Sequence, residues 1–478
     1  MRRIIFSIAA MLCAMNTAAQ EETHMMGLLP DDGTYETLPR KAELLTRDYT
    51  MLPSSYSLRQ YCPEVRSQGY YGTCTSWAVS YAARTIAEAV KYGWTDKQRI
   101  TQEAFSPIFV YTLVKAEGDD ECQKGTHIHK SLQMMKEVGV PKLYSFNVMC
   151  ANYISDDLKR RAAPYKIDDY FTLFGIQFTD GKEKIRKVKK SLTEDCPVVI
   201  AMWLPNSFHQ AGDKWSGIDI DPTKHGYHAM CVIGYDDEIN GGSFQIMNSW
   251  GRNWGNQGFV WVRYSDFAKY VDQAYEVYVK KDTQPKPEPE PEPEPKPKPE
   301  PKVLNLLSGS VELCLSTGEK MVPVYNAGKD MYEIQGEYIS RTRYRVYISN
   351  NEPAYVYVIG SDLRDNTSRL FPPADNISAA LTYKSNHVAI PDETYYLEMD
   401  DVRGKDYLCV LYSKEAIDIN AVIGKMKTAG GSFRDKVMSV VSGKTANKAD
   451  VSYASGTMTF KAETEKTLVP VFIEIKHI

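Results

Sequence analysis

Long apolar runs, closely spaced cysteines and an excess of positive charge are all missing from most of this chain. After residue 19 there is no run of the roughly 20 apolar residues that a membrane-spanning helix needs, so no transmembrane segment is predicted. No pair among the nine cysteines has the close spacing of a zinc site, and we expect neither a metal nor another cofactor. The formal net charge of −4 gives no reason to expect nucleic acid as a partner.

The first 19 residues predict a signal peptide. Arg2 and Arg3 supply a basic start, residues 4–14 form a short apolar stretch, and residues 17–19 are small enough for cleavage. Cys13 follows a leucine where a lipoprotein signal requires a small residue, so a cleaved and unanchored chain is favoured. We therefore expect an exported protein, in the periplasm, at the cell surface or secreted, where cysteines can oxidise.

A chain of 478 residues is too long for one core, so two domains are expected. Residues 284–302 alternate proline with glutamate or lysine, which forbids helix and sheet and predicts an extended spacer. Pro30–Gly33 marks a turn in the polar stretch before the first domain. The predicted layout is a signal peptide (1–19), a short leader or N-terminal arm (20–50), a first domain (51–282), a spacer (283–302) and a second domain (303–478).

Hydrophobic periodicity predicts a helical first half and a β-rich second half for the first domain. One helix is expected to start at Cys74 and to end at Gly93, and another to cover residues 128–138. Lys182–Leu192 is predicted to be a basic helix whose lysines form a solvated face. The predicted strands of this domain are 170–174, 197–202, 228–235, 244–247 and 259–262.

The second domain is predicted to be β-rich. Residues 419–427 are expected to form a short helix, with the carboxylate of Asp418 as its N-cap. Two closing strands, 450–454 and 468–476, are expected to pair with each other. The other predicted strands are 344–348, 354–359 and 406–412.

Cys74 is the candidate nucleophile. A thiol attacks only as the thiolate, and the N-terminus of a helix lowers the pKa of a cysteine placed there. Gln68 lies six residues earlier, where its amide can donate a hydrogen bond to an oxyanion that develops beside the sulfur. Such a cysteine needs a histidine beside the sulfur and a third group that fixes the imidazole ring. The histidines of the first domain are His127, His129, His209, His225 and His228.

His228 is favoured over its main rival His225, because a buried strand ending in Gly-Tyr-Asp follows His228 directly. Asn248 lies at the end of the next predicted strand, 20 residues on, where it can accept a hydrogen bond from the imidazole. Trp250 would then cover that bond from water. Asn-Ser-Trp-Gly at residues 248–251 therefore supplies the orienting and shielding groups.

In this order, the segments 65–78, 228–237 and 248–251 resemble the active-site segments of papain-like cysteine peptidases. The resemblance implies a two-lobed α+β fold in which the cysteine helix and the histidine strand face each other across a cleft. It implies Cys74, His228 and Asn248 as catalytic residues, Gln68 as the oxyanion donor and Trp250 as the shield. No room is left for the long helical propeptide that many members of the family carry, so the source of latency is open.

The chain departs from the family beside the nucleophile. Thr75 stands where the family usually has tryptophan, and Tyr71 where it usually has a cysteine, so the usual disulfide of that loop cannot form. Cys122 must then pair elsewhere, with Cys62 or Cys150 as candidates, or stay reduced. Eight cysteines remain without the signal peptide; reserving the nucleophile leaves an odd number, and Cys196 and Cys231 lie in apolar runs that suit buried thiols.

The leading hypothesis is an exported cysteine peptidase that hydrolyses protein or peptide substrates. A papain-fold transpeptidase or amidotransferase is the first alternative, and a non-enzymatic surface-binding protein that works through the second domain is another. Residues 330–425 resemble a β-rich domain of unknown function that is appended to bacterial secreted or signalling enzymes. Such a domain is a candidate for binding substrate, an envelope component or a protein partner.

Overall fold

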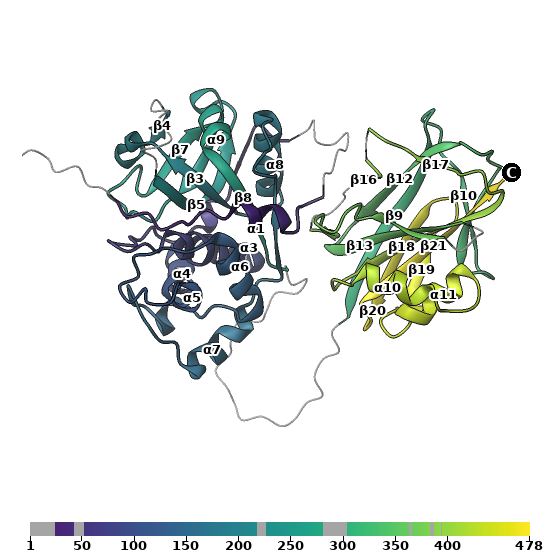
Figure 1. Cartoon of the computed structure of the whole chain (residues 1–478), viewed down its shortest axis with the longest axis horizontal. Helices are drawn as coiled ribbons and strands as arrows, with labels where there is room; N and C mark the ends of the chain where they lie inside the picture. Colours follow the sequence, from purple (N-terminus) through teal and green to yellow (C-terminus); the bar gives the residue numbers. More distant parts are fainter. Residues whose placement is uncertain are drawn as a thin grey trace, which may run out of the picture.

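The computed structural model shows two units side by side, coloured purple to teal and green to yellow in Figure 1. The first combines helices with a mixed sheet and the second is mostly β, so the predicted α+β class is confirmed. The predicted signal peptide, the predicted spacer and His225 lie outside the described residues. The structure describes residues 24–42, 52–217, 226–280, 304–362, 366–382, 387–392 and 394–478.

A long helix starts at Cys74, as predicted, and organises the helical lobe. It consists of α2 (Cys74–Ser76), a π-helical stretch η3 (Trp77–Arg84) and α3 (Thr85–Tyr92). It ends at Gly93, which adopts a left-handed conformation (φ 65°) that glycine reaches without strain. No helix in the described ranges is long and apolar enough to cross a membrane. The α-helices that follow it in this unit are α4 (Lys97–Gln102), α5 (Pro107–Val114), α6 (Ile128–Glu137), α7 (Asp156–Ala162), α8 (Gly181–Thr193) and α9 (Tyr264–Tyr270).

The sheet of the first unit places its longest strand, β5 (Gly226–Asp236), in the middle. Its order is β2-β8-β3-β5-β6-β7-β4, with β1 also paired to β5. Residues 227–235 are all buried, because β5 packs beneath the cysteine helix and between two neighbouring strands. The remaining strands are β1 (Ser55–Ser57), β2 (Asp169–Thr172), β3 (Val198–Leu204), β4 (Lys214–Trp215), β6 (Ser243–Met247), β7 (Phe259–Arg263) and β8 (Val271–Tyr278).

Two predictions for this unit were wrong. Where a turn was expected at residues 30–33, the short helix α1 (Asp32–Thr37) begins, because the side chain of Asp31 accepts from the Thr34 N–H at 3.2 Å and caps it. The lysines of α8 do not all face solvent. Lys184 is buried and donates to the Val271 carbonyl at 3.0 Å, since its long stem follows the apolar surface beneath the helix.

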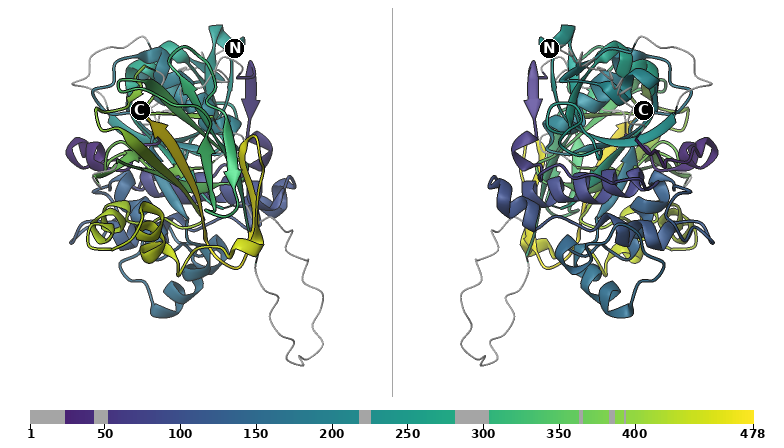
Figure 2. Two further views of the ribbon diagram at one scale, coloured as in Figure 1. Left: turned by 90° about the vertical axis from the view of Figure 1, so that its right-hand side faces the viewer. Right: turned by 90° about the vertical axis from the view of Figure 1, so that its left-hand side faces the viewer.

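The second unit is a two-sheet sandwich. One sheet has the order β10-β11-β21-β18-β13-β14, with β15 on β13, and the other β16-β12-β9-β20-β19, with β17 on β12. Figure 2 shows the helices α10 (Ile419–Met426) and α11 (Phe433–Val441) beside the first of these sheets. The strands are β9 (Asn305–Leu315), β10 (Pro323–Asn326), β11 (Met331–Ile334), β12 (Arg343–Asn350), β13 (Ala354–Ser361), β14 (Thr367–Phe371), β15 (Ala380–Leu381), β16 (Val388–Ile390), β17 (Leu397–Glu398), β18 (Gly404–Ser413), β19 (Val451–Tyr453), β20 (Met458–Thr464) and β21 (Leu468–His477).

Alternation along β13 and β18 explains how one sheet serves two cores. Val356 and Val358 face the other sheet, whereas Tyr355 and Tyr357 lie on the opposite face, as the period of two in a strand requires. On that face the Tyr357 hydroxyl accepts the Ile417 N–H just before α10, and the Tyr355 hydroxyl donates to the Asp169 carboxylate of the first unit at 3.1 Å. The predicted helix over residues 419–427 is confirmed, and Asp418 caps it by accepting from the Ala421 N–H at 2.9 Å. The expected pairing of the two closing strands was wrong: β19 pairs with β20, and β21 pairs with β18 and β11.

Candidate functional site

Cys74 lies buried at the first turn of its helix, facing β5. Its Sγ accepts the backbone N–H of Gly27 at 3.2 Å, and the N–H of Ala229, the residue after His228, also favours the thiolate. Burial is the larger effect and raises the pKa of the Cys74 thiol. In this state of the molecule the sulfur therefore carries its proton near neutral pH.

His228 stands near the start of β5, with its ring fully buried. Its Nε2 donates to Oδ1 of Asn248 at 2.8 Å, while Nδ1 has no hydrogen-bond partner among the described residues. Burial lowers the pKa of His228 to about 3, against the opposing effect of the Asn248 hydrogen bond. The imidazole is therefore neutral in this state, as the thiol of Cys74 is.

Asn248 follows the last residue of β6, in the hairpin partner of β5. The register of that pair opposes Cys231 to Met247, which brings the start of β5 and the end of β6 to the same place. Oδ1 of Asn248 accepts a second hydrogen bond, from the Ser249 N–H at 2.7 Å. Two donors thus fix the amide oxygen, so the side chain holds the imidazole ring in one orientation.

Gln68 is held by a residue that the sequence interpretation did not single out. Ser249 donates its hydroxyl to Oε1 of Gln68 at 2.6 Å, and its carbonyl accepts the Gln68 N–H at 2.8 Å. Nε2 of Gln68 is left to donate to the carbonyls of Tyr71 (2.8 Å) and Met25 (3.1 Å). The only sequence signal for Ser249 was its place inside the Asn-Ser-Trp-Gly string.

Trp250 covers the histidine from the solvent side. Its ring centroid lies 4.6 Å from that of His228, and the two imidazoles of His24 and His209 stack on it at 4.5 and 5.1 Å. His209 lies in the short helix η6 (Asn206–Gln210), half-buried beside Trp250. Beyond Trp250 lies an open cavity of 1220 Å³, lined by residues 65–67, 69–70, 209–212 and 250–255 together with His24.

His225 lies outside the described residues, and the other two histidine candidates are on a different element from His228. His127 and His129 are at the start of α6, where Nε2 of His129 is 3.7 Å from the Asp31 carboxylate. Desolvation lowers the pKa of His129 to about 4, which leaves it neutral near pH 7.

The N-terminal arm, defined here as residues 24–42, passes over the thiol. Gly27 donates to the sulfur, its carbonyl accepts from the Thr126 N–H at 2.8 Å, and Leu29 donates to the Thr126 carbonyl at 3.0 Å. The arm thus presents an amide N–H to Cys74, whereas nucleophilic attack requires a carbonyl carbon. The arm therefore covers the sulfur with Gly27 and places the Met25 carbonyl at Nε2 of Gln68.

Comparison with known proteins matches most of the first unit to one family. The model of the papain family cysteine proteases matches residues 52–278, and that of a domain of unknown function, DUF4384, matches residues 337–416. Residues 52–278 form a papain-family cysteine protease domain. The second unit contains the domain of unknown function and is called the accessory domain below.

Individual relatives of the papain-family domain are distant. An uncharacterized peptidase C1-like protein of Acanthamoeba polyphaga mimivirus is 25% identical over 221 residues, which are 43% of this chain and 64% of that protein. The match thus spans less than two thirds of the viral protein. Among solved structures, xylellain, a cysteine protease from Xylella fastidiosa, is 22% identical, with a TM-score of 0.44 over 54% of this chain and 96% of that one. Digestive procathepsin L 3 of Tenebrio molitor is 16% identical, with a TM-score of 0.41 over 52% and 77%.

The papain-family domain has one disulfide within the described residues, Cys122–Cys150. Of the two candidate partners for Cys122, the structure selects Cys150, while Cys62 is a buried thiol. Cys196 and Cys231 are also buried thiols, which agrees with their predicted surroundings. The loop before Cys74 therefore holds its shape without a disulfide of its own.

We predict that Gly27→Ala opens the site. A Cβ at Gly27 would lie 1.9 Å from the carbonyl oxygen of Gly72, which is backbone and cannot turn away. Overpacking of this kind costs about 1–3 kcal/mol, which corresponds to a roughly 5- to 150-fold increase in the population with the arm displaced. The measurement is the rate at which iodoacetamide alkylates Cys74, followed by peptide mapping to separate it from the other thiols.

Gly33→Ala is the matched control for this prediction. Gly33 lies on the same arm, in α1, and a Cβ there meets no atom within 4 Å. Its alkylation rate is expected to equal that of the unmodified chain. Equal rates for both variants would mean that the arm does not cover the thiol in solution.

Proposed function

We propose that the chain is an exported cysteine peptidase whose papain-family domain hydrolyses peptide bonds in protein or peptide substrates through Cys74, His228 and Asn248. The hydrogen bond from His228 to Asn248, beside a cysteine at a helix N-terminus, is the observation that carries the proposal. It supplies the nucleophile, the acid–base group and the orienting group of a covalent acyl-transfer mechanism.

In the first half of the reaction the Cys74 thiolate attacks the carbonyl carbon of the peptide. The developing oxyanion accepts hydrogen bonds from Nε2 of Gln68 and the backbone N–H of Cys74. Support for the role of Gln68 comes from its present partner, because the same Nε2 already donates to a carbonyl in the cleft, that of Met25. His228 then gives its proton to the leaving amine, and a thioester to Cys74 remains.

In the second half His228 acts as the base. It takes a proton from the water that attacks the thioester, and collapse of the tetrahedral intermediate returns the Cys74 thiolate and releases the acid. Asn248 keeps the imidazole in one orientation through both halves, and Trp250 shields their hydrogen bond from water.

The ion pair that this mechanism needs is disfavoured while Cys74 and His228 are buried in this way. Under the arm, burial raises the pKa of Cys74 and lowers that of His228, and both shifts favour neutral groups. Departure of the arm readmits water, which stabilises the thiolate and the imidazolium. The arm would therefore suppress activity in two ways, by filling the cleft and by keeping the dyad uncharged.

Export is part of the proposal. The basic, apolar and small-residue segments of residues 1–19 are those of a signal peptide. The Cys122–Cys150 disulfide fits an oxidising compartment outside the cytoplasm.

A thiol-directed peptidyl epoxide tests the proposed function. In the Gly27→Ala chain we expect one adduct, at Cys74, and at least about a 100-fold slower reaction when His228→Ala removes the group that draws the thiol proton. Absence of the Cys74 adduct, or labelling unaffected by the histidine substitution, would contradict the proposal. Products formed with an added amine acceptor distinguish hydrolysis from transpeptidation, the alternative with the same dyad.

A further inference from the structure

The end of the arm extends the sheet of the papain-family domain. Residues 39–41 run parallel to β2, an edge strand: the Lys41 N–H donates to the Thr172 carbonyl at 2.9 Å, and the Thr172 N–H donates to the Pro39 carbonyl at 3.0 Å. An added strand satisfies the unpaired backbone groups of an edge. The arm is thus attached to the catalytic domain well away from the cysteine.

The same residues are bonded to the accessory domain on their other side. The Arg40 N–H donates to the Asn376 carbonyl at 2.6 Å, and the Ser378 N–H donates to the Arg40 carbonyl at 2.7 Å. Ala42, the next residue but one, is 7% exposed and belongs to the apolar core between the two sheets of the accessory domain. The end of the arm is therefore shared by both domains.

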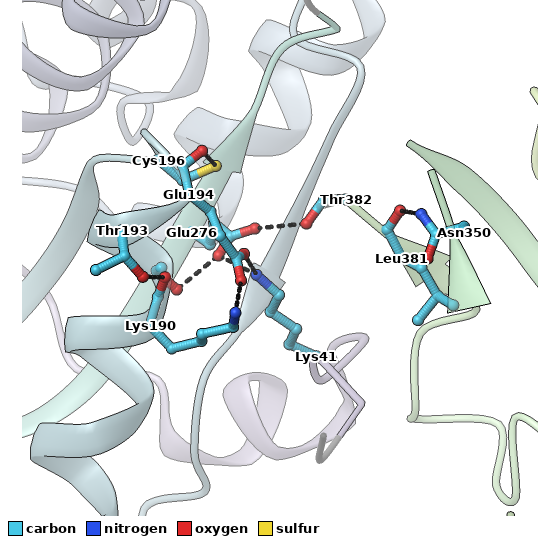
Figure 3. Close-up of polar contacts among 10 residues, drawn as sticks. Lys41, Lys190, Thr193, Glu194, Cys196, Glu276, Asn350, Leu381 and Thr382 are labelled. Atoms are coloured by element: carbon cyan, nitrogen blue, oxygen red, sulfur yellow. Dashed lines mark hydrogen bonds and ion pairs between the residues drawn. The ribbon is translucent and has the colours of Figure 1, made fainter. Parts of the chain in front are cut away.

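A buried charged cluster lies at this three-way junction (Figure 3). Nζ of Lys41 lies 2.5 Å from Oε2 of Glu276 and 3.0 Å from Oε2 of Glu194, and all three side chains are less than 10% exposed. From the accessory domain, the Thr382 hydroxyl donates to the other oxygen of Glu276 at 3.3 Å. Removal of Lys41 would leave the buried carboxylate of Glu276 without its cation, whereas Glu194 would keep Lys190 at 2.9 Å, so the arm is preferred at this position.

A chain of contacts leads from the junction back toward the cleft. The Arg40 guanidinium pairs with Glu36 in α1 at 2.8 Å, and Oε1 of Glu36 accepts the Ile176 N–H at 2.5 Å. One residue before Glu36, the Tyr35 hydroxyl donates to the Phe174 carbonyl at 2.6 Å. The helix α1 thus joins the junction to the segment that covers Cys74, and Figure 1 shows it on the side of the catalytic domain that faces the accessory domain.

We propose that the accessory domain is a clamp that holds the N-terminal arm over the active site, so that displacement of this domain exposes Cys74. The arm is the partner of the surface formed by residues 376–382. Because coupling between two sites is reciprocal, an arm that leaves the cleft also weakens the docking of the accessory domain. Exposure of Cys74 controls substrate access only if the proposed peptidase function holds. The contacts of the clamp can be tested without measuring peptidase activity.

Ala42→Glu in the full-length chain tests the clamp. A carboxylate at this position cannot enter the apolar core of the accessory domain, and the arm contributes no strand to the sandwich, so the two folds are expected to persist. We expect at least tenfold faster amide hydrogen exchange at Arg40 and Lys41. At the cleft end we expect at least threefold faster exchange at Gly27 and Leu29, and alkylation of Cys74 that is faster by a similar factor.

Gly33→Glu is the matched control, because it adds the same charge to the same arm at an exposed position with open space around it. It should leave all of these rates unchanged. The clamp is refuted if Ala42→Glu leaves exchange at residues 40–41 unchanged, or if it releases these residues while Gly27, Leu29 and Cys74 stay protected. If the variant releases its arm and exposes Cys74 but hydrolyses no peptide, the result would contradict the proposed function. It would still support the clamp.

Discussion

Cys74→Ser, introduced into the Gly27→Ala chain, is expected to lower the rate of peptide hydrolysis by about 10⁴-fold or more. A serine hydroxyl in the same place has no accessible anionic form near neutral pH, and His228 held by Asn248 is arranged to accept a proton from a thiol. The measurement is kcat/KM for a fluorogenic peptide, in a background where the arm no longer hides the cysteine.

Cys62→Ser is the control for that loss. Cys62 is as fully buried as Cys74, and its Sγ donates to the Leu58 carbonyl at 3.6 Å, so serine here brings the same change of sulfur to oxygen to an equally buried site. The control should therefore retain most of the activity of the Gly27→Ala chain. Activity that survives Cys74→Ser would remove this cysteine from the chemistry, and an equal loss in the control would point to a folding defect.

Segments with strong local signals could be predicted from the sequence. The helix from Cys74 to Gly93 has apolar residues at helical spacing and a glycine where its chain turns, and β5 is a continuous apolar run. Helix α5 likewise starts at residues with local helix-start character, with Pro107 at its first position and the Ser106 hydroxyl capping the first turn. These signals lie within a few residues of one another, so tertiary contacts did not need to be known.

The closing strands of the accessory domain show that local sequence signals do not determine strand pairing. The positions of both strands, β19 and β21, were close to those predicted, but each pairs with a different neighbour in a different sheet. Pairing is decided by contacts far apart in sequence, and β20, which takes the place beside β19, was not foreseen. A strand pattern therefore predicts which segments are extended more readily than it predicts their order.

The arm was the least predictable part of the site. Met25 and Gly27 carry no motif, and their roles come only from the cleft into which they fit, beside Gln68 and Cys74. Position 27 requires glycine because Gly72, from a different part of the chain, lies against it. Sequence alone left the source of latency open for this reason.

Ser249 was missed for a similar reason, since its effect passes through another side chain. We predict that, in the Gly27→Ala chain, Gln68→Ala lowers kcat by about 10²–10³-fold, as removal of one oxyanion-hole donor does. Ser249→Ala should cost less, about tenfold, because the Gln68 amide stays in place but loses the hydroxyl that fixes its Oε1 at 2.6 Å. Steady-state kinetics with one fluorogenic peptide would measure both losses, with KM expected to change little.

The double variant decides whether Ser249 is a positioning residue. If Ser249 acts only through Gln68, then Gln68→Ala with Ser249→Ala should be no slower than Gln68→Ala alone, because the hydroxyl no longer has an amide to orient. Losses that multiply would instead show that Ser249 acts independently, for example by holding the turn after Asn248.

Ser67→Ala, in the same cleft wall, is the control for the loss of a serine hydroxyl. Ser67 is exposed and its hydroxyl accepts the Gly69 N–H at 3.0 Å, away from the Gln68 amide, so this variant should keep full activity.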